Sequence, residues 1–151
     1  MKILFVCTGN TCRSLVAELY LKNYIEQFRL NGIEVNSCGI SASPFFRVPD
    51  IIKKILKKDN IEVRGHVATS VNEQLVNNAD IILVMEKLHQ SVLLSRYPWI
   101  KSKIYLLKEY IGDYNNGTEI SDPIGQTEEM YEHCAEMIKE CIKKLVNKLK
   151  L

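Results

Sequence analysis

Residues 2–14 read KILFVCTGNTCRS, a continuous apolar run followed by a short polar loop. The run from Ile3 to Val6 does not alternate with polar residues, which is typical of a strand buried on both faces. Apolar residues then recur at helical spacing, and Gly32 indicates the end of the helix. These apolar helix positions are Val16, Leu19, Tyr20, Tyr24 and Phe28. The stretch therefore predicts a strand, a tight loop and a helix.

The rest of the chain continues to alternate between strand and helix patterns. Further strands are predicted at residues 33–40, 80–85 and 103–110. The predicted helices are residues 49–60, a short segment opened by a Ser70 and Glu73 capping box, a segment ended by Pro98, and a long segment from Thr127. Such alternation favours parallel strands joined by right-handed crossovers. We expect a three-layer α/β fold in one domain over residues 1–151, with a four-stranded parallel sheet and helices on both faces.

The composition fits an ordinary globular chain rather than a specialised class. Hydrophobic residues make up 46% and charged residues 25% of the 151 positions, and the net charge of +2 is too small to indicate nucleic acid as a partner. The longest apolar runs are far shorter than the roughly 18 residues needed to span a bilayer, so no membrane association is expected. Five cysteines, an odd number in a chain of this size, favour reduced thiols in the cytoplasm over a disulfide framework.

The loop after the first strand has the features of an anion site, at the sheet edge where such folds bind ligands. Between a strand end and a helix start, several backbone N–H groups can point inward, and the helix dipole adds positive potential. Gly9 permits a tight turn, Asn10 tolerates left-handed dihedrals, and Arg13 offers a planar fork of donors for phosphate oxygens. Such surroundings stabilise a thiolate, so Cys7 is the predicted nucleophile, with Ser14 as a hydrogen-bond donor to its sulfur.

Residues 6–14, VCTGNTCRS, resemble the signature of the low-molecular-weight protein tyrosine phosphatase family, and Asp122-Pro123 resembles its second signature. The resemblance extends from residue 3 to about residue 150. It implies hydrolysis of phosphorylated proteins through a cysteinyl-phosphate, with Cys7, Arg13 and Asp122 as catalytic residues and with no cofactor and no metal. Topology also supports Asp122, because the loop after the fourth strand emerges at the same sheet edge as Cys7. A carboxylic acid there could protonate the leaving group and then activate water.

The resemblance also assigns the residues that surround the catalytic ones. Phosphate or another oxyanion would contact the loop residues Thr8, Gly9, Asn10, Thr11, Cys12 and Ser14. Ser37 and His66 would join a hydrogen-bond network with Asn10 and Ser14 that holds the loop in shape. Cys12 could also trap an oxidised Cys7 as a reversible disulfide. His89 and His133 have no predicted partner, and we expect both at solvated helix positions.

The chain departs from tyrosine-directed members of the family at several positions. Leu15 stands where most members have proline, which is expected to loosen the helix start without abolishing phosphate binding. Thr11 stands where those members usually have Ile or Leu, and Ile124 and Gly125 stand where aromatic residues commonly follow Asp-Pro.

Thr11 and the LKEY segment at residues 107–110, interpreted as the end of the fourth strand, resemble the protein-arginine phosphatase branch instead. A threonine hydroxyl suits a polar substrate better than a phenyl ring, and Asp122 would also pair with a substrate guanidinium. We therefore favour phosphoarginine over phosphotyrosine. Phe45 and Phe46 fit either the pocket wall or the core.

Two other functions share this loop. Thioredoxin-coupled arsenate reductases resemble the chain in fold and loop, but they need two further cysteines near the third strand, and none lies between Cys38 and Cys134. A phosphoprotein-binding module would need neither a nucleophile nor an acid, so the combination of cysteine, arginine and aspartate favours an enzyme.

A zinc site is a further alternative. Its candidate ligands are Cys7, Cys12, Cys38 and His66. These residues lack the pairs at two- to four-residue spacing that structural zinc sites usually use, and zinc binding would abolish the anion-binding shape of the loop.

Overall fold

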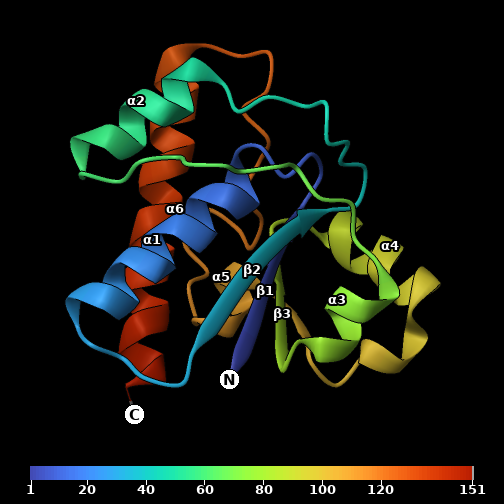
Figure 1. Cartoon of the computed structure of the whole chain (residues 1–151). Helices are drawn as coiled ribbons and strands as arrows, with labels where there is room; N and C mark the ends of the chain where they lie inside the picture. The colour runs from blue at the N-terminus through green and yellow to red at the C-terminus, as the bar shows by residue number, and fades with distance from the viewer. Residues whose placement is uncertain (151) are drawn as a thin grey trace.

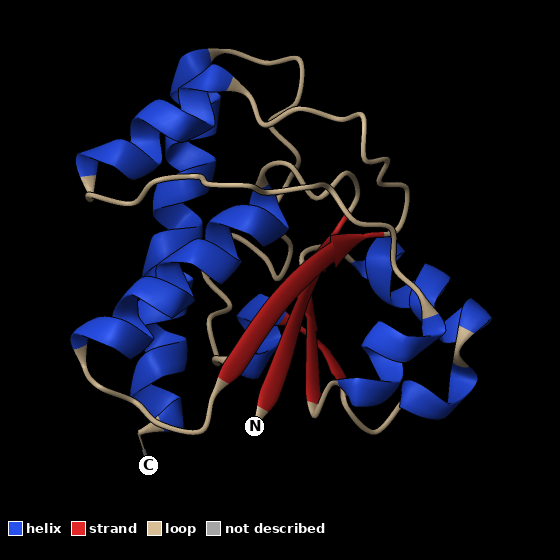
Figure 2. Cartoon of the chain, in the orientation of Figure 1, coloured by secondary structure: helices blue, strands red, loops and turns tan. Residues whose placement is uncertain are grey.

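The structure is a computed structural model that describes residues 1–150. Within these residues, four parallel strands form one sheet in the order β2-β1-β3-β4 (Figure 1, Figure 2). The strands are β1 (Lys2–Cys7), β2 (Glu34–Gly39), β3 (Ile81–Val84) and β4 (Ile104–Leu106). In β1, Val6 lies opposite Cys38 of β2 and Val84 of β3. The predicted α/β fold with a four-stranded parallel sheet is therefore confirmed.

Helices cover both faces of the sheet (Figure 1). One face carries α1 (Arg13–Gln27), α2 (Asp50–Lys58) and α6 (Glu128–Leu149), and the other carries α3 (Glu73–Asn78), α4 (Lys87–Arg96) and the 3₁₀ helix η1 (Pro98–Ile100). Alternate residues of β1 enter the two cores, with Phe5 packed on the α1 and α6 side and Val6 on the α3 and α4 side. The uninterrupted apolar run of β1 is thus explained by burial on both faces.

The fourth strand is shorter than predicted, and the LKEY segment is not part of it. Residues Leu107–Tyr110 form the short helix α5, closed by a hydrogen bond from the Ile111 N–H to the Leu107 carbonyl. The two adjacent leucines explain the turn, because Leu106 packs in the α3 and α4 core whereas Leu107 packs in the α1 and α6 core. The strand prediction failed here because the apolar run KIYLL continues through this change of structure.

The predicted capping box of α3 is also wrong. The N-cap is Asn72, whose side chain accepts a hydrogen bond from the Leu75 N–H at 2.8 Å. Ser70 instead forms an isolated β-bridge with Gly39 at the end of β2.

The long helix begins as expected, because the Thr127 hydroxyl caps the Met130 N–H of α6. In α6, Cys134, Ile138, Cys141 and Leu145 are buried, whereas Met130 is exposed.

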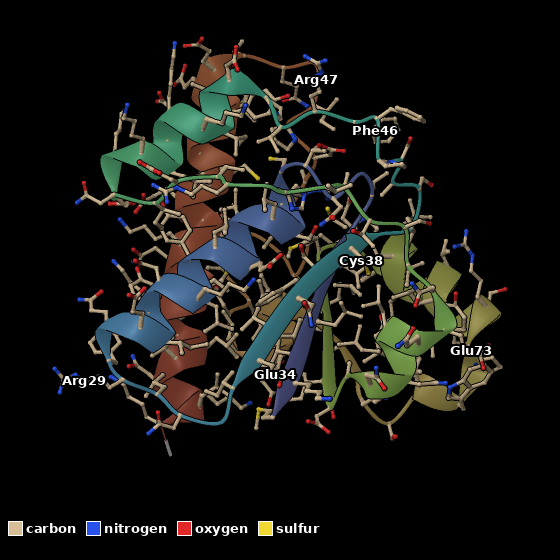
Figure 3. The ribbon with its side chains drawn as sticks, viewed as in Figure 1. Arg29, Glu34, Cys38, Phe46, Arg47 and Glu73 are labelled. Atoms are coloured by element: carbon tan, nitrogen blue, oxygen red, sulfur yellow. The ribbon has the colours of Figure 1, made fainter. Side chains whose placement is uncertain are left out.

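The two ends of the sheet differ in what surrounds them. Figure 3 shows Phe46 and Arg47 on the loop between β2 and α2, beyond the strand end marked by Cys38, whereas Glu34 and Arg29 lie at the opposite end. The loop after β1 lies at the same end as Cys38. Within residues 1–150, no helix combines the length and the hydropathy needed to cross a bilayer.

Candidate active site

The end of β1 and the start of α1 converge on the sulfur of Cys7. The Cys7 Sγ lies 2.9 Å from the Ser14 Oγ, and the Ser14 N–H donates to the same sulfur at 3.4 Å. The first residue before α1, Cys12, provides no side-chain cap, so the amides at the helix start are not occupied by a cap. A helix start of this kind attracts anions. The predicted nucleophile and the predicted anion site therefore occupy one place.

Asn10 connects the loop to its surroundings. It is fully buried and has a φ of 59°, the left-handed conformation that asparagine tolerates. The Asn10 Nδ2 donates to the Ser14 Oγ at 2.9 Å and to the Ser37 Oγ at 2.8 Å. The backbone carbonyl oxygen of Asn10 lies 2.7 Å from the His66 Nε2. Because the Ser14 oxygen accepts from Asn10, its own proton is free to point to the Cys7 sulfur. The structure thus brings together all the residues expected to brace the loop.

Arg13 is almost completely buried and has partners on both terminal nitrogens. Its Nη1 donates to the Glu86 Oε2 at 2.7 Å and to the Ile120 carbonyl at 2.8 Å. Its Nη2 lies 3.3 Å from both the Thr8 Oγ1 and the Asp122 Oδ2. Burial opposes the guanidinium charge, but the Glu86 hydrogen bond and the neighbouring Cys7 and Asp122 raise the Arg13 pKa above its ordinary value. Arg13 is therefore a fixed cation beside Cys7.

Asp122 reaches Arg13 from the acid loop, which we define as residues 119–126. The Ile120 N–H of this loop donates to the Met85 carbonyl at 2.9 Å, which attaches the loop to the end of β3. The Asp122 Oδ1 accepts the Ile124 N–H at 3.0 Å, so that one oxygen closes a turn and the other faces Arg13. About a third of the Asp122 side chain is exposed, at 33%. The carboxylate thus lies between the buried guanidinium and solvent.

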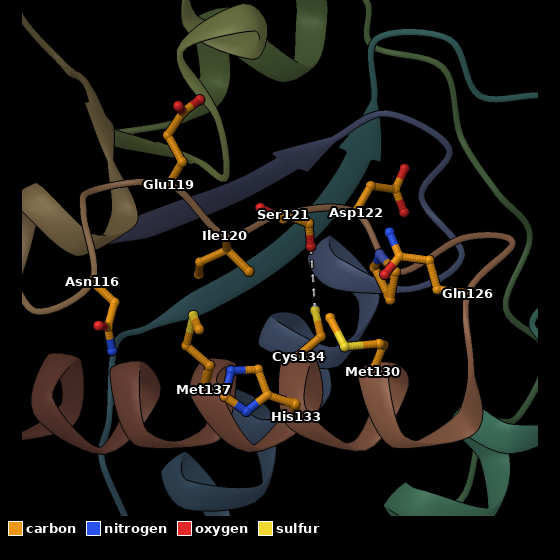
Figure 4. A pocket seen from close by; sticks show the side chains of 11 residues that line it. Asn116, Glu119, Ile120, Ser121, Asp122, Gln126, Met130, His133, Cys134 and Met137 are labelled. Carbon is orange, nitrogen blue, oxygen red and sulfur yellow. Dashed lines mark hydrogen bonds between the residues drawn. The ribbon is translucent and has the colours of Figure 1, made fainter.

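A cavity of about 350 Å³ lies between the acid loop and α6 (Figure 4). Met130, Cys134 and Met137 extend from α6 toward the loop, and the Cys134 thiol lies 3.8 Å from the Ser121 carbonyl. Of the three predicted catalytic residues, Asp122 lines this cavity. The cavity therefore adjoins the acid loop on its α6 side.

Two loop side chains, Thr11 and Cys12, are buried. The pKa of Cys12 is raised, mainly by a hydrogen bond with the Cys134 thiol and secondly by burial. Cys12 therefore stays protonated beside Cys7. All five cysteines are free in the part of the chain that the structure describes.

The aromatic pair does not pack in the core. Phe45 is 88% exposed and Phe46 is 50% exposed. A Cβ built at Gly9 would lie 3.7 Å from the Phe46 ring, which places this ring beside the loop that follows β1. The core alternative for these residues is therefore wrong.

The expectation for His89 is also wrong, although His133 is exposed as predicted. His89 is fully buried, with its Nε2 2.9 Å from the Thr8 Oγ1 and its Nδ1 3.0 Å from the Glu86 nitrogen. Sequence reasoning also missed Glu86, the closest acidic partner of Arg13. The available signal was the position of both residues just after β3, at the same sheet edge as Cys7.

The zinc alternative fails on topology. Cys7 and Cys12 belong to the core on the α1 and α6 side, whereas Cys38 belongs to the core on the other side of the sheet. Among residues 1–150, no three histidine, cysteine or acidic side chains converge as a metal site would require.

Comparison with known proteins identifies the class to which this site belongs. The family described as "Low molecular weight phosphotyrosine protein phosphatase" matches residues 2–151. A protein-arginine-phosphatase of Bacillus subtilis is 33% identical over 150 residues, which cover 99% of this chain and 97% of the relative. PtpB, a low molecular weight protein-tyrosine-phosphatase of Staphylococcus aureus, is 36% identical over 152 residues, which cover 96% of each chain. The chain therefore belongs to the low molecular weight phosphotyrosine protein phosphatase family and is a cysteine-dependent protein phosphatase.

Solved structures agree with this assignment. A YwlE arginine phosphatase superposes with a TM-score of 0.91 at 32% identity, covering 99% of this chain and 96% of the other. A low molecular weight protein tyrosine phosphatase from T. tengcongensis has a TM-score of 0.90 at 35% identity, covering 98% and 99%. The relatives and structures thus include both substrate classes that the sequence left open.

Proposed function

We propose that this phosphatase hydrolyses phosphoarginine in proteins, with Cys7, Arg13 and Asp122 as its catalytic residues. The observation that carries the proposal is the Asp122 carboxylate 3.3 Å from Arg13, between that buried cation and solvent. The ionised form of Asp122 can pair with a guanidinium, and its protonated form can transfer a proton to the leaving nitrogen of the substrate. The loop would also bind free phosphate and other oxyanions.

In the first step, the phosphoryl group of the substrate enters the loop. The contacts of Arg13 with Glu86 and Ile120 hold Nη1, so that Nε–H and the more weakly bound Nη2 can donate to phosphoryl oxygens. Ser14 donates to the Cys7 thiolate and keeps it directed at phosphorus. The amides of the loop and of the α1 start stabilise the negative oxygens.

Cys7 then attacks phosphorus, an S–P bond forms, and the P–N bond to the guanidino group breaks. Asp122 gives its proton to the departing nitrogen, and the product leaves as a neutral or protonated arginine side chain. Asp122, now ionised, takes a proton from water as that water attacks the phosphocysteine. The S–P bond breaks, inorganic phosphate leaves, and Cys7 returns as a thiolate. A solved YwlE arginine phosphatase with serine in place of cysteine and a phosphorylated active-site serine supports a covalent intermediate of this kind.

Thr11 is the proposed specificity residue. It lies in the loop between Cys7 and Arg13, where a hydroxyl offers a hydrogen-bond partner to a guanidino group that an aliphatic side chain lacks. Ile124 and Gly125 after Asp-Pro also leave the acid loop without the aromatic residues that suit a phenyl ring.

The test is a side-by-side measurement of kcat/KM on matched phosphoarginine and phosphotyrosine peptides. We expect the native enzyme to prefer phosphoarginine, and Thr11→Val or Thr11→Ile to lower this preference about tenfold, because one hydrogen bond to a charged group is lost. Thr11→Ser is the matched control, since it keeps the hydroxyl and should keep the preference. A native preference for phosphotyrosine that Thr11→Ile leaves unchanged would contradict the proposal.

Phosphotyrosine is the second candidate, and one observation favours it. The half-exposed Phe46 ring beside Gly9 provides an aromatic surface next to the loop. Offset stacking on a substrate phenyl ring is worth about 1 kcal/mol. If phosphotyrosine is the substrate, Phe46→Ala will lower kcat/KM for phosphotyrosine peptides several-fold and leave phosphoarginine peptides unaffected.

A further inference from the structure

The buried ring of His89 connects α4 to the phosphate-binding loop. It belongs to the first turn of α4, and both of its nitrogens have partners. Its Nε2 lies 2.9 Å from the hydroxyl of Thr8, the residue after Cys7, and its Nδ1 lies 3.0 Å from the backbone nitrogen of Glu86. A buried histidine with two specific contacts has one defined orientation.

These contacts assign the tautomer of the ring. The backbone N–H of Glu86 can only donate, so the Nδ1 of His89 must be the unprotonated nitrogen. The neutral ring therefore carries its proton on Nε2 and donates to the Thr8 oxygen. Burial, and next the positive charge of Arg13, lower the His89 pKa to about 4, which keeps the ring neutral at physiological pH.

Both partners of His89 hold Arg13. The Thr8 oxygen accepts from His89 and lies 3.3 Å from Nη2, while the Glu86 carboxylate accepts from Nη1 at 2.7 Å. His89 also completes a reciprocal capping box, in which the Glu86 side chain accepts from the His89 backbone and the His89 ring accepts from the Glu86 backbone. The His89 ring therefore holds in place both the Thr8 hydroxyl, which faces Nη2 of Arg13, and the Glu86 carboxylate, which accepts from Nη1.

Without the imidazole, neither acceptor is held in place. A threonine hydroxyl rotates freely about its C–O bond and can present its proton instead of a lone pair. A glutamate at a helix start without its reciprocal cap samples other rotamers. Arg13 would then lose the fixed orientation that lets a planar fork meet two phosphoryl oxygens at once.

We propose that His89 is a positioning residue of the phosphatase, which holds the Arg13 guanidinium in its phosphate-binding orientation through Thr8 and Glu86 without touching the substrate. The inference rests on the proposed role of Arg13 in binding the phosphoryl group.

The experiment separates the two hydrogen bonds of the ring. His89→Gln places an amide N–H near the position of Nε2, His89→Asn keeps an acceptor near Nδ1 but does not reach Thr8, and His89→Leu removes both contacts. The readouts are kcat/KM on a phosphopeptide, the inhibition constant of inorganic phosphate, and the melting temperature. His133→Leu, at an exposed histidine of α6, is the matched control.

We expect His89→Leu and His89→Asn to lower kcat/KM about 10- to 100-fold and to weaken phosphate inhibition in parallel, as misplacement of a binding group does. His89→Gln should recover most of the loss, and His133→Leu should change neither constant. In a Thr8→Val background, His89→Asn should add little further loss, because the two residues act through one contact.

Three results would overturn the inference. The first is a folded His89→Asn variant with native kcat/KM and native phosphate inhibition. The second is a loss of kcat/KM that follows the melting temperature across the series of variants. The third is a double variant of Thr8→Val and His89→Asn whose loss of kcat/KM equals the sum of the two single losses in free energy. A failure of the catalytic proposal would give another result: Cys7→Ser would keep its turnover, both with His89 and with the His89 variants.

Discussion

The phosphate loop, residues 7–14, and the acid loop, residues 119–126, meet at Arg13 but are built in different ways. In the phosphate loop, Asn10, Arg13 and Ser14 are buried. Asn10 and Arg13 have hydrogen-bond partners in other parts of the chain, and Ser14 pairs with Cys7 and Asn10 within the loop. In the acid loop, Asp122 is 33% exposed and Ile124 is 54% exposed. The loop is attached to β3 through one backbone hydrogen bond at Ile120. In the proposed mechanism, the buried loop carries out the chemistry that every phosphorylated substrate shares, and the exposed loop carries out the chemistry that depends on the leaving group.

The largest effect is expected at the buried loop. Cys7→Ser replaces the proposed nucleophile with a hydroxyl and should lower kcat by about 10⁴-fold or more, because covalent catalysis is lost. The anion site itself stays intact, so inorganic phosphate should still bind with nearly native affinity, measured by isothermal titration calorimetry. Cys141→Ala, at a buried cysteine of α6, is the control and should keep native kcat. Native hydrolysis by Cys7→Ser would refute the proposed mechanism.

The acid loop gives a smaller effect that depends on the substrate. Asp122→Asn should lower kcat about 10²- to 10³-fold on phosphoarginine or phosphotyrosine peptides, since proton transfer to the leaving group is lost. The loss should be much smaller on p-nitrophenyl phosphate, whose leaving group needs little protonation. Phosphate should bind no more weakly, because a negative charge 3.3 Å from Arg13 is removed.

Glu119→Gln is the matched control for this measurement. Glu119 belongs to the same acid loop, and its carboxylate accepts the Lys87 N–H at 2.9 Å. Equal losses from Asp122→Asn on all three substrates would show that the acid loop does not distinguish leaving groups, and the contrast between the two loops would fail.

The location of both loops at one edge of the sheet was predictable from the sequence. Strand and helix patterns place Cys7 and Asp122 at one sheet edge, because the carboxyl ends of parallel strands share that edge. The pairing of Asn10 with Ser37 and His66 needed the family resemblance, since these residues are distant in sequence.

Other features were not predictable from local pattern. His89 has the spacing of a solvated helix residue, yet it is buried because the start of α4 packs against the phosphate loop. The turn from β4 into α5 depends on which core Leu106 and Leu107 enter, which no single window of sequence reveals. The disulfide between Cys7 and Cys12 stays a prediction, which thiol mapping after peroxide treatment would test.

Gly39 is a further residue that the sequence did not distinguish, and it allows the shape of the buried loop to be tested by itself. The end of β2 runs against the loop here, with the Ile40 N–H donating to the Cys7 carbonyl and the Ser41 N–H to the Thr8 carbonyl. A Cβ built at Gly39 would lie 2.3 Å from the Thr8 oxygen and 3.0 Å from the Asn10 nitrogen. Both neighbours are backbone atoms, so the loop has to move if a side chain is introduced.

Gly39→Ala should therefore destabilise the protein by about 1–3 kcal/mol, measured by urea unfolding, as overpacking does. It should also weaken phosphate binding about tenfold, because the loop amides are displaced. Gly117→Ala is the control: its φ of +84° makes the substitution strained, but nothing lies within 4 Å of the new Cβ. It should lower stability and leave phosphate affinity unchanged. If Gly39→Ala bound phosphate with native affinity, the buried loop would be adaptable rather than preformed, and its contrast with the acid loop would be one of burial alone.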